Sequence, residues 1–161
     1  MLLRPATTED IPAILALERL PASAQFVGQW TEGRHLATLM SPDACYYASE
    51  SENSDLRAYV ILRGLAESSG SIELKRLVVH PAGQGLGRRI LGEVLRIAFE
   101  EFHAHRVFLD VFDDNARAIH LYSSFGFVEE GLMREAAIRD GMYCSLRLMS
   151  LLEREYAARK G

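Results

Sequence analysis

The chain has 161 residues, of which 48% are hydrophobic and 25% charged, and its formal net charge is −4. These proportions are typical of a globular protein with one hydrophobic core, so we expect a single domain over residues 1–161. The mildly acidic balance and the lack of a lysine- or arginine-rich run argue against nucleic-acid binding.

The first half of the chain mixes helical and strand patterns. In order, it predicts an edge strand at residues 2–6, a helix after residues 8–10, a loop at 21–30, a shorter helix at 31–40, and strands at 44–49 and 56–65. Pro5 favours an edge strand because proline cannot donate a backbone hydrogen bond within a sheet. A polar turn joins the last two of these strands.

The second half repeats the alternation more regularly. It predicts a strand at residues 72–79, helices at 88–103 and 115–125, a strand at 105–112, the start of another at 127–130, and a last strand at 142–151 before a charged tail. Strict alternation fails at Leu77, Val78 and Val79, which indicates a strand buried on both faces near a sheet centre. Because helices are interleaved with strands, we expect an α/β protein with a mixed sheet.

Cys45 and Cys144 are too few for a disulfide framework and lack the clustered partners of a zinc site. Residues 1–5 do not resemble a signal peptide, and no apolar run approaches the roughly 18 residues of a membrane span. We therefore expect a cytoplasmic protein with reduced thiols, no bound metal and no membrane association.

Three alternating glycines, Gly83, Gly85 and Gly87, lie between the strand at 72–79 and the helix at 88–103. Glycine permits sharp turns and a close approach of ligand to backbone, and the N–H groups of a helix start attract anions. A tight turn with two solvated arginines is the alternative interpretation. Two nucleotide motifs fail: Gly-Lys-Ser/Thr of a P-loop is absent, and Ile90 stands where a dinucleotide fingerprint needs glycine.

A second pattern runs over residues 115–127, Asn-Ala-Arg-Ala-Ile-His-Leu-Tyr-Ser-Ser-Phe-Gly-Phe. It predicts a helix with Asn115 as its N-cap and Gly126 at its end. The pattern alone leaves open whether Tyr122 belongs to the core, the surface or a catalytic site.

Together the two segments resemble the GNAT superfamily of acetyl-CoA-dependent N-acetyltransferases, most closely over residues 72–127. Val-Val-His-Pro-Ala-Gly-Gln-Gly-Leu-Gly-Arg at 78–88 resembles that family's coenzyme A loop, and Asn115, Tyr122 and the Phe-Gly-Phe at 125–127 resemble its second signature. The resemblance implies an α/β (α+β) fold with a mixed, mostly antiparallel sheet flanked by helices on both faces. It also implies transfer of the acetyl group of acetyl-CoA to a primary amine by direct attack in a ternary complex.

The resemblance also implies roles for particular residues. The backbone of Leu77, Val78 and Val79 would pair with the pantetheine arm. The pyrophosphate would be held by Gln84, Gly85, Leu86, Gly87, Arg88 and Arg89. Asn115 would hold the arm or order the loop beside it. The chain departs from the family at Ala82, where the usual loop carries arginine or glutamine, so backbone N–H groups and the arginines are expected to carry the binding.

Acetyl transfer needs a proton acceptor for the amine, a donor to the oxyanion, a proton for the thiolate, and positioning. A backbone N–H of Val78 or Val79 is the expected oxyanion donor. Tyr122 would lie near the sulfur and act as the acid, because its reference pKa near 10 keeps it protonated. The resemblance offers Asp110 or Glu73 as the base, either directly or through water.

The acceptor is not identified by the sequence; a small-molecule amine, a protein N-terminus and a lysine all remain open. Phe26 and Trp30 are expected to form a wall of the acceptor site, or simply to cover the sheet. A non-catalytic acyl-CoA sensor and a binder of some other nucleotide are the competing functions. A homodimer through residues 142–151 is a further expectation.

Overall fold

Seven strands form one sheet in a computed structural model that describes residues 2–161, in the order β1-β2-β3-β4-β5-β7-β6. The strands are β1 (Arg4–Pro5), β2 (Ala44–Glu50), β3 (Leu56–Arg63), β4 (Ser71–Val79), β5 (Arg106–Phe112), β6 (Val128–Arg139) and β7 (Met142–Leu152). Among residues 2–161 only β4 and β5 are parallel neighbours, and the other pairs are antiparallel. The expected mixed, mostly antiparallel sheet is therefore confirmed.

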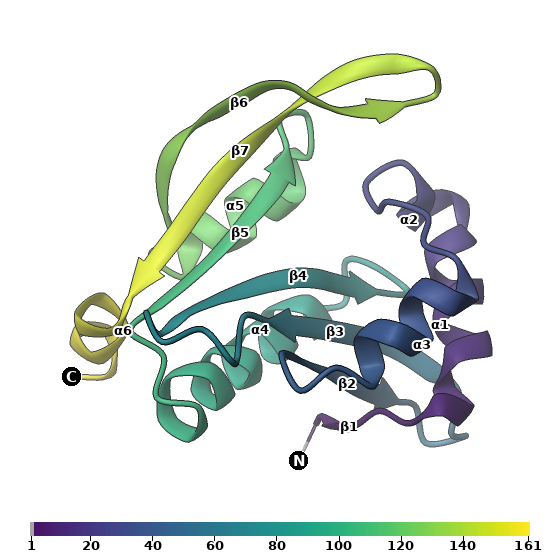
Figure 1. Ribbon diagram of the computed structural model, residues 1–161, viewed down its shortest axis with the longest axis horizontal. Coiled ribbons are helices and arrows are strands. Elements are labelled where there is room, and N and C mark those ends of the chain that lie inside the picture. Colours follow the sequence, from purple (N-terminus) through teal and green to yellow (C-terminus); the bar gives the residue numbers. More distant parts are fainter. Residues whose placement is uncertain (1) are drawn as a thin grey trace.

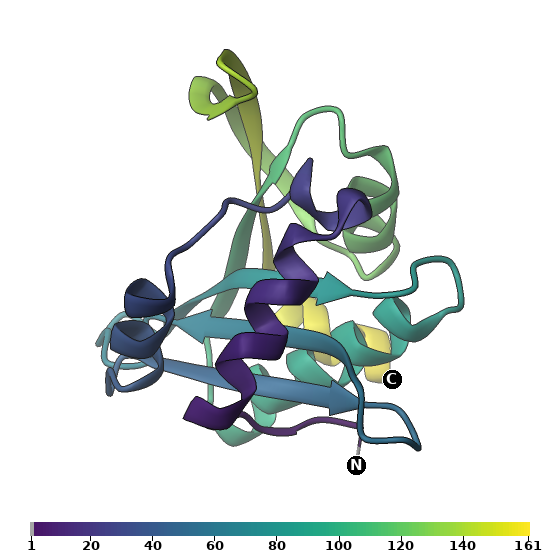
Figure 2. The same ribbon diagram turned by 90° about the vertical axis from the view of Figure 1, so that its right-hand side faces the viewer.

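Helices cover both faces of this sheet (Figures 1 and 2). They are η1 (Thr8–Asp10), α1 (Ile11–Arg19), α2 (Pro21–Ala24), α3 (Glu32–Leu39), α4 (Leu86–Arg96), the π-helical turn η2 (Ile97–Glu101), α5 (Ala116–Ser124) and α6 (Glu153–Lys160). Figure 2 shows α1 and α3 in front of the strands and α4 and α6 behind them. Among the described residues, no helix is long and apolar enough to cross a membrane.

Alternate residues of β3 enter two separate cores. Ala58, Val60 and Leu62 pack with α4, whereas Tyr59 and Ile61 pack with α1. This follows from the two-residue period of a strand, and all five residues are fully buried. Burying each large side chain of this kind stabilises the fold by roughly 1.5–3 kcal/mol.

A β-bulge in β4 changes which residues face each core. Ile61 of β3 pairs with Arg76 and Leu62 pairs with Leu74, so Lys75 has no opposite residue. The extra residue reverses the alternation beyond it. Val78 consequently packs with the α1 core while its neighbours pack against the α4 core. This explains the failed alternation at residues 77–79 and confirms burial on both faces there.

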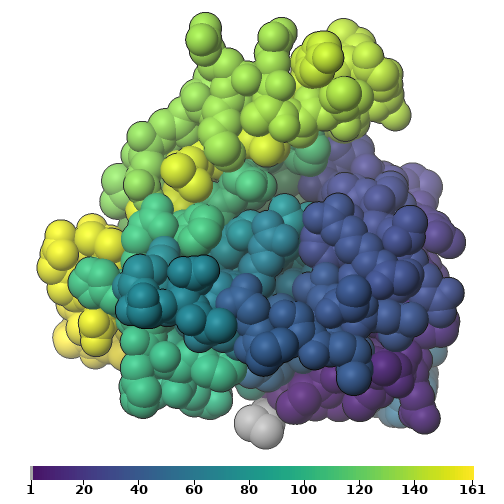
Figure 3. Space-filling model, viewed as in Figure 1, coloured from purple at the N-terminus to yellow at the C-terminus, as the bar shows by residue number. Residues whose placement is uncertain are grey.

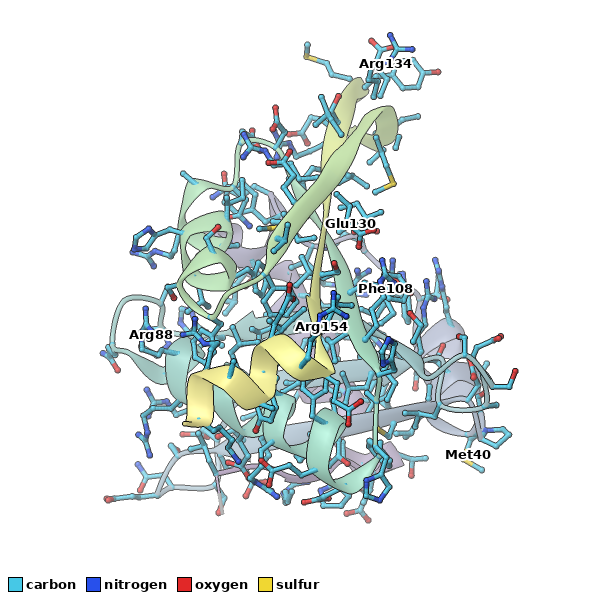
Figure 4. The ribbon with its side chains drawn as sticks, turned by 90° about the vertical axis from the view of Figure 1, so that its left-hand side faces the viewer. Met40, Arg88, Phe108, Glu130, Arg134 and Arg154 are labelled. Atoms are coloured by element: carbon cyan, nitrogen blue, oxygen red, sulfur yellow. The ribbon has the colours of Figure 1, made fainter. Side chains whose placement is uncertain are left out.

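One prediction of local structure is wrong, and one segment without a predicted structure forms a helix. Residues 21–24 form α2 instead of part of a loop, because Pro21 occupies the first position of a helix, where proline is well tolerated. The charged tail forms α6, with acidic residues in its first turn and basic residues in its last, as the helix dipole favours. Tyr156 anchors this helix by stacking on Phe99 at 4.6 Å between ring centroids. Figure 4 shows α6 lying across the end of the sheet.

Candidate active site

The parallel pair β4 and β5 is joined over only three residues of each strand. Ser71–Glu73 pair with Arg106–Phe108, and beyond them β4 pairs with β3 alone. The strands diverge from that point, with the β6–β7 hairpin following β5 away from β4 (Figure 1). The remaining edge of β4 toward β5 therefore offers unpaired backbone groups to a ligand.

Two cavities open where the strands separate. The loop-side cavity, of about 390 Å³, is bounded by β4, α2, α5 and the loop that carries Gly83, Gly85 and Gly87, here called the glycine loop. The hairpin-side cavity, of about 440 Å³, is bounded by β4, β5, α3 and the β6–β7 hairpin. Figure 3 shows the hairpin projecting beyond the teal and blue surface of the β4 side. Six residues line both cavities: Phe26, Val27, Leu77, Asn115, Ala118 and Tyr122.

The glycine loop places a helix start beside the loop-side cavity. Gly85 is the N-cap of α4 with φ 74°, a left-handed backbone conformation that residues other than glycine rarely adopt. A Cβ built on Gly85 meets nothing within 4 Å, so the space around this turn is open. The first N–H groups of α4 have no carbonyl partner within the helix. The loop therefore presents donors and a positive helix end toward an anion.

The predicted loop residues take different positions. Gly87 lines the loop-side cavity, whereas the side chain of Leu86 is buried in the core. The amide oxygen of Gln84 accepts a hydrogen bond from Arg57 at 3.0 Å. The guanidinium of Arg88 donates to Ser124 at 2.9 Å on the outer surface (Figure 4), and Arg89 is exposed as well. Neither arginine lines the cavity.

Arg117 is a cation of the loop-side cavity that the sequence analysis did not identify. It lines the cavity, and its Nη2 lies 3.7 Å from a Cβ built on Gly83. Its place in the first turn of α5, two residues after Asn115, is the only sequence signal. Basic residues are unfavourable at a helix start unless an anion is near, and that rule could have pointed to it.

Asn115 caps α5 as predicted. Its Oδ1 accepts a hydrogen bond from the backbone N–H of Ala118 at 3.3 Å, and the residue lines both cavities. The cap fixes the start of the helix that carries Tyr122. The hydrogen bond of Asn115 therefore orders the loop that precedes α5.

Tyr122 lies at the wall between the cavities. Its side chain is buried, and its ring centroid lies 5.6 Å from that of Phe127. Burial, assisted by the negative charge of Asp110, raises the pKa of Tyr122 well above its ordinary value. The phenol is consequently protonated at neutral pH and able to donate a proton or hydrogen bond.

The two predicted carboxylates are not equivalent. Asp110 lines the hairpin-side cavity together with Tyr122. Glu73 lines neither cavity; it lies in the paired part of β4, where its Oε2 accepts a hydrogen bond from Nε of Arg63 at 2.8 Å. The structure therefore brings Asp110 to Tyr122 and holds Glu73 in a cross-strand ion pair.

Phe26 and Trp30 both lie at the hairpin-side cavity, and Phe26 also lines the other one. The Cζ atoms of Arg34 and Arg76 lie 3.9 and 4.8 Å from the Trp30 ring centroid. These arginines and Lys75 also line the cavity and were not predicted as site residues. Burial lowers the pKa of Lys75, against the raising effect of the Asp110 charge. In residues 2–161 no group of three or more His, Cys, Asp or Glu side chains could hold a metal ion.

Comparison with known proteins identifies relatives of this architecture. Residues 14–127 match the model of the Acetyltransferase (GNAT) family. The chain is 33% identical over 86 residues to the spermidine N(1)-acetyltransferase of Vibrio cholerae serotype O1, an alignment that covers 52% of this chain and 50% of that protein. It is 28% identical over 134 residues to the L-methionine sulfoximine/L-methionine sulfone acetyltransferase of Salmonella typhimurium, covering 80% of this chain and 74% of that one.

A solved structure supports the fold. The spermidine N-acetyltransferase of Vibrio cholerae in complex with CoA and spermine superposes with a TM-score of 0.85 at 24% identity, covering 96% of each chain. At this identity the likeness establishes the fold alone. The aligned segment spans about half the length of the Vibrio cholerae spermidine N(1)-acetyltransferase named above.

Proposed function

This chain belongs to the GNAT acetyltransferase family, and we propose that it transfers the acetyl group of acetyl-CoA to a primary amine. The single observation that carries the proposal is the wall shared by the two cavities, where Leu77, Asn115 and Tyr122 line both. One cavity adjoins an anion-binding loop and the other contains a carboxylate. A thioester entering from the first side would meet an amine entering from the second.

Acetyl-CoA is the substrate of the loop-side cavity in this proposal. The end of the glycine loop and the first turn of α4, from Gln84 to Arg89, would bind the pyrophosphate through backbone N–H groups, with Arg117 supplying a charge. The pantetheine arm would pair with the unpaired edge of β4 at Leu77, Val78 and Val79, as an added strand pairs with a sheet edge. Because Ala82 supplies no polar side chain, the backbone of the loop carries most of the binding.

The chemistry is a direct attack. The amine nitrogen donates its lone pair to the thioester carbonyl carbon, and a backbone N–H of Val78 or Val79 stabilises the oxyanion. The carbon–sulfur bond then breaks, the thiolate takes the phenol proton of Tyr122, and the amine proton passes to Asp110 directly or through water. We favour Asp110 over Glu73 because Asp110 alone lines the cavity with Tyr122.

A small-molecule amine is the acceptor class that we propose. A volume of about 440 Å³ falls within the range of small-molecule sites. The family relatives named for spermidine and for L-methionine sulfoximine both act on small amines, according to their names. A protein N-terminus or lysine is the less favoured alternative.

We also propose that the β6–β7 hairpin mediates a homodimer. It projects from the sheet in Figure 1, and its exposed apolar residues are Val128, Leu132, Ile138, Met142 and Tyr143. Five large apolar residues exposed on one projecting hairpin fit burial against a second copy of the chain. Light scattering after size-exclusion chromatography should give a dimer mass, and Ile138→Lys should convert it to a monomer mass.

The experiment that tests the proposed function is incubation of the protein with acetyl-CoA and a panel of amine classes while free thiol is followed. The enzyme should release thiol only when a suitable amine is present. Binding of acetyl-CoA without thiol release from any amine would instead indicate an acyl-CoA sensor. A melting-temperature increase with ATP but none with CoA would indicate a different nucleotide ligand.

A further inference from the structure

The hairpin-side cavity is positively charged although the whole chain has a net charge of −4. Its charged lining residues are the cations Arg34, Lys75 and Arg76 and the anion Asp110. Such a lining favours a ligand with negative charge and disfavours one that adds several positive charges. The charge of this cavity therefore restricts the charge of the acceptor that it can bind.

The two arginines are held in place by an aromatic ring. The Arg34 and Arg76 guanidinium carbons lie 3.9 and 4.8 Å from the centroid of Trp30, which is buried. Arg76 also donates a hydrogen bond to the carbonyl oxygen of Gly28 at 3.1 Å. Behind Trp30 lies His35, whose Nε2 is 2.8 Å from Oε1 of Glu18. The cations are thus positioned before any ligand binds.

These two arginines are also free of carboxylate partners among residues 2–161. Other arginines are paired, such as Arg63 with Glu73 and Arg147 with Asp113. Lys75 has only a 4.0 Å contact with Glu73. A guanidinium without an internal carboxylate is suited to bind an external one, through its planar set of donors.

Charge is distributed across the elements that bound the cavity. Asp110 is on β5, whereas Arg34 is on α3 and Arg76 on β4. We propose that the acceptor, given the acetyl transfer proposed above, is a small amine that also carries a carboxylate, as an amino acid does. Its amine is held by Asp110 beside Tyr122, and its carboxylate is bound by Arg34 and Arg76. A polyamine, which carries only positive charges, fits this lining poorly.

The test compares each member of a panel of L-amino acids with its decarboxylated amine and its amide, alongside spermidine. The amine is more basic than the amino acid and the amide less basic, so basicity alone cannot favour the amino acid over both. We expect the best amino acid to exceed both of its partners in kcat/KM by about tenfold or more, as for a charge-assisted hydrogen-bonded pair. Spermidine or a decarboxylated amine as the best acceptor would overturn the proposal.

Variants locate the effect. Arg34→Gln and Arg76→Gln should each raise KM for the amino acid about tenfold and leave KM for its decarboxylated amine nearly unchanged. Arg154→Gln, which removes the same charge from an exposed position on α6 (Figure 4), should change neither. If both cavity variants still prefer the amino acid over its decarboxylated amine as the wild type does, the assignment of these arginines is overturned.

A binding measurement separates this inference from the proposed function. Calorimetry of the CoA-loaded protein should show tighter binding of the amino acid than of its decarboxylated amine, whether or not thiol is released. Binding with that preference but no turnover would overturn the acetyltransferase proposal and support carboxylate recognition. Turnover with a preference for decarboxylated amines would support the acetyltransferase proposal and overturn carboxylate recognition.

Discussion

Leu77 on β4 and Tyr122 on α5 line both cavities, at the separation between β4 and β5. The strand contributes backbone groups that no neighbouring strand uses, and the helix contributes a buried phenol. The arrangement depends on parallel pairing that stops after Glu73 and Phe108. Direct acetyl transfer at this junction requires both groups.

Replacing Tyr122 tests the acid role. Tyr122→Phe retains the ring beside Phe127 but removes the hydroxyl, so kcat should fall about 10²–10⁴-fold with little change in KM for acetyl-CoA. Tyr156→Phe is the matched control, because Tyr156 lies on α6 and lines neither cavity. Initial rates of thiol release give both parameters, and an undiminished kcat in Tyr122→Phe would remove the phenol from the mechanism.

The pH profile should also report on this tyrosine. Burial and the Asp110 charge raise the pKa of Tyr122, so its proton is kept to higher pH than in an ordinary tyrosine. We therefore expect no loss of kcat from phenol deprotonation between about pH 8 and pH 10, the reference value for tyrosine. A descending limb in that interval that is present in the wild type and absent in Tyr122→Phe would show that the proton leaves earlier.

The glycine loop is tested at Gly85. Alanine at φ 74° is strained by about 1–2 kcal/mol, and relief of the strain would shift the N–H groups at the start of α4. We expect Gly85→Ala to raise the Kd for CoA about tenfold or more and to lower the free energy of unfolding. Calorimetry and urea unfolding measure the two effects.

Gly33→Ala is the control for that substitution. Gly33 is exposed on α3, and a Cβ there meets nothing within 4 Å. Alanine should stabilise this helix by about 0.5–1 kcal/mol and leave CoA affinity unchanged. Equal effects of the two substitutions on CoA affinity would contradict a special role for the loop.

A buried hydrogen-bonded cluster lies behind Trp30, and its loss should lower the free energy of unfolding strongly. His35 is fully buried, with Nδ1 2.8 Å from the Tyr46 hydroxyl and Nε2 2.8 Å from Oε1 of Glu18. Tyr59 donates to the same carboxylate oxygen at 2.5 Å. His35→Leu keeps the volume but leaves Glu18 short of a partner. The free energy of unfolding should fall by about 3–5 kcal/mol, as when one partner of a buried pair is removed.

Urea unfolding measures this loss. Ala37→Gln, an exposed substitution on the same helix, should stay within about 0.5 kcal/mol of the wild type. A loss below 1 kcal/mol in His35→Leu would show that the polar group is dispensable for the fold.

The sequence predicts the elements around the site because their signals are local. The apolar stripe of α4, the Asn115 cap and the glycines each act within a few residues. The π-helical geometry of η2, which lies within the helix expected at 88–103, and the helix α6 carry no such signal. The first departs from the 3.6-residue period, and the second has few apolar residues. Short or charged segments of this kind depend on tertiary contacts.

The contents of the cavities are harder to predict, because they depend on long-range register. The bulge at Lys75 decides which side of β4 each later residue faces, and the sequence shows only its consequence, the lost alternation at residues 77–79. Glu73 and Asp110 look equivalent along the chain. Only the end of β4–β5 pairing at Glu73 separates a residue in the sheet from one at the cavity. Arg34, from a distant helix, joins the site only through folding.

The most direct test of the central claim is a matrix of initial rates in which acetyl-CoA and an accepted amine are both varied. Direct attack where the two cavities meet requires both substrates to be bound together. Double-reciprocal plots should therefore intersect, and no thiol should be released before the amine is added. Parallel lines, with acetyl-enzyme detected by mass spectrometry in the absence of amine, would contradict the account.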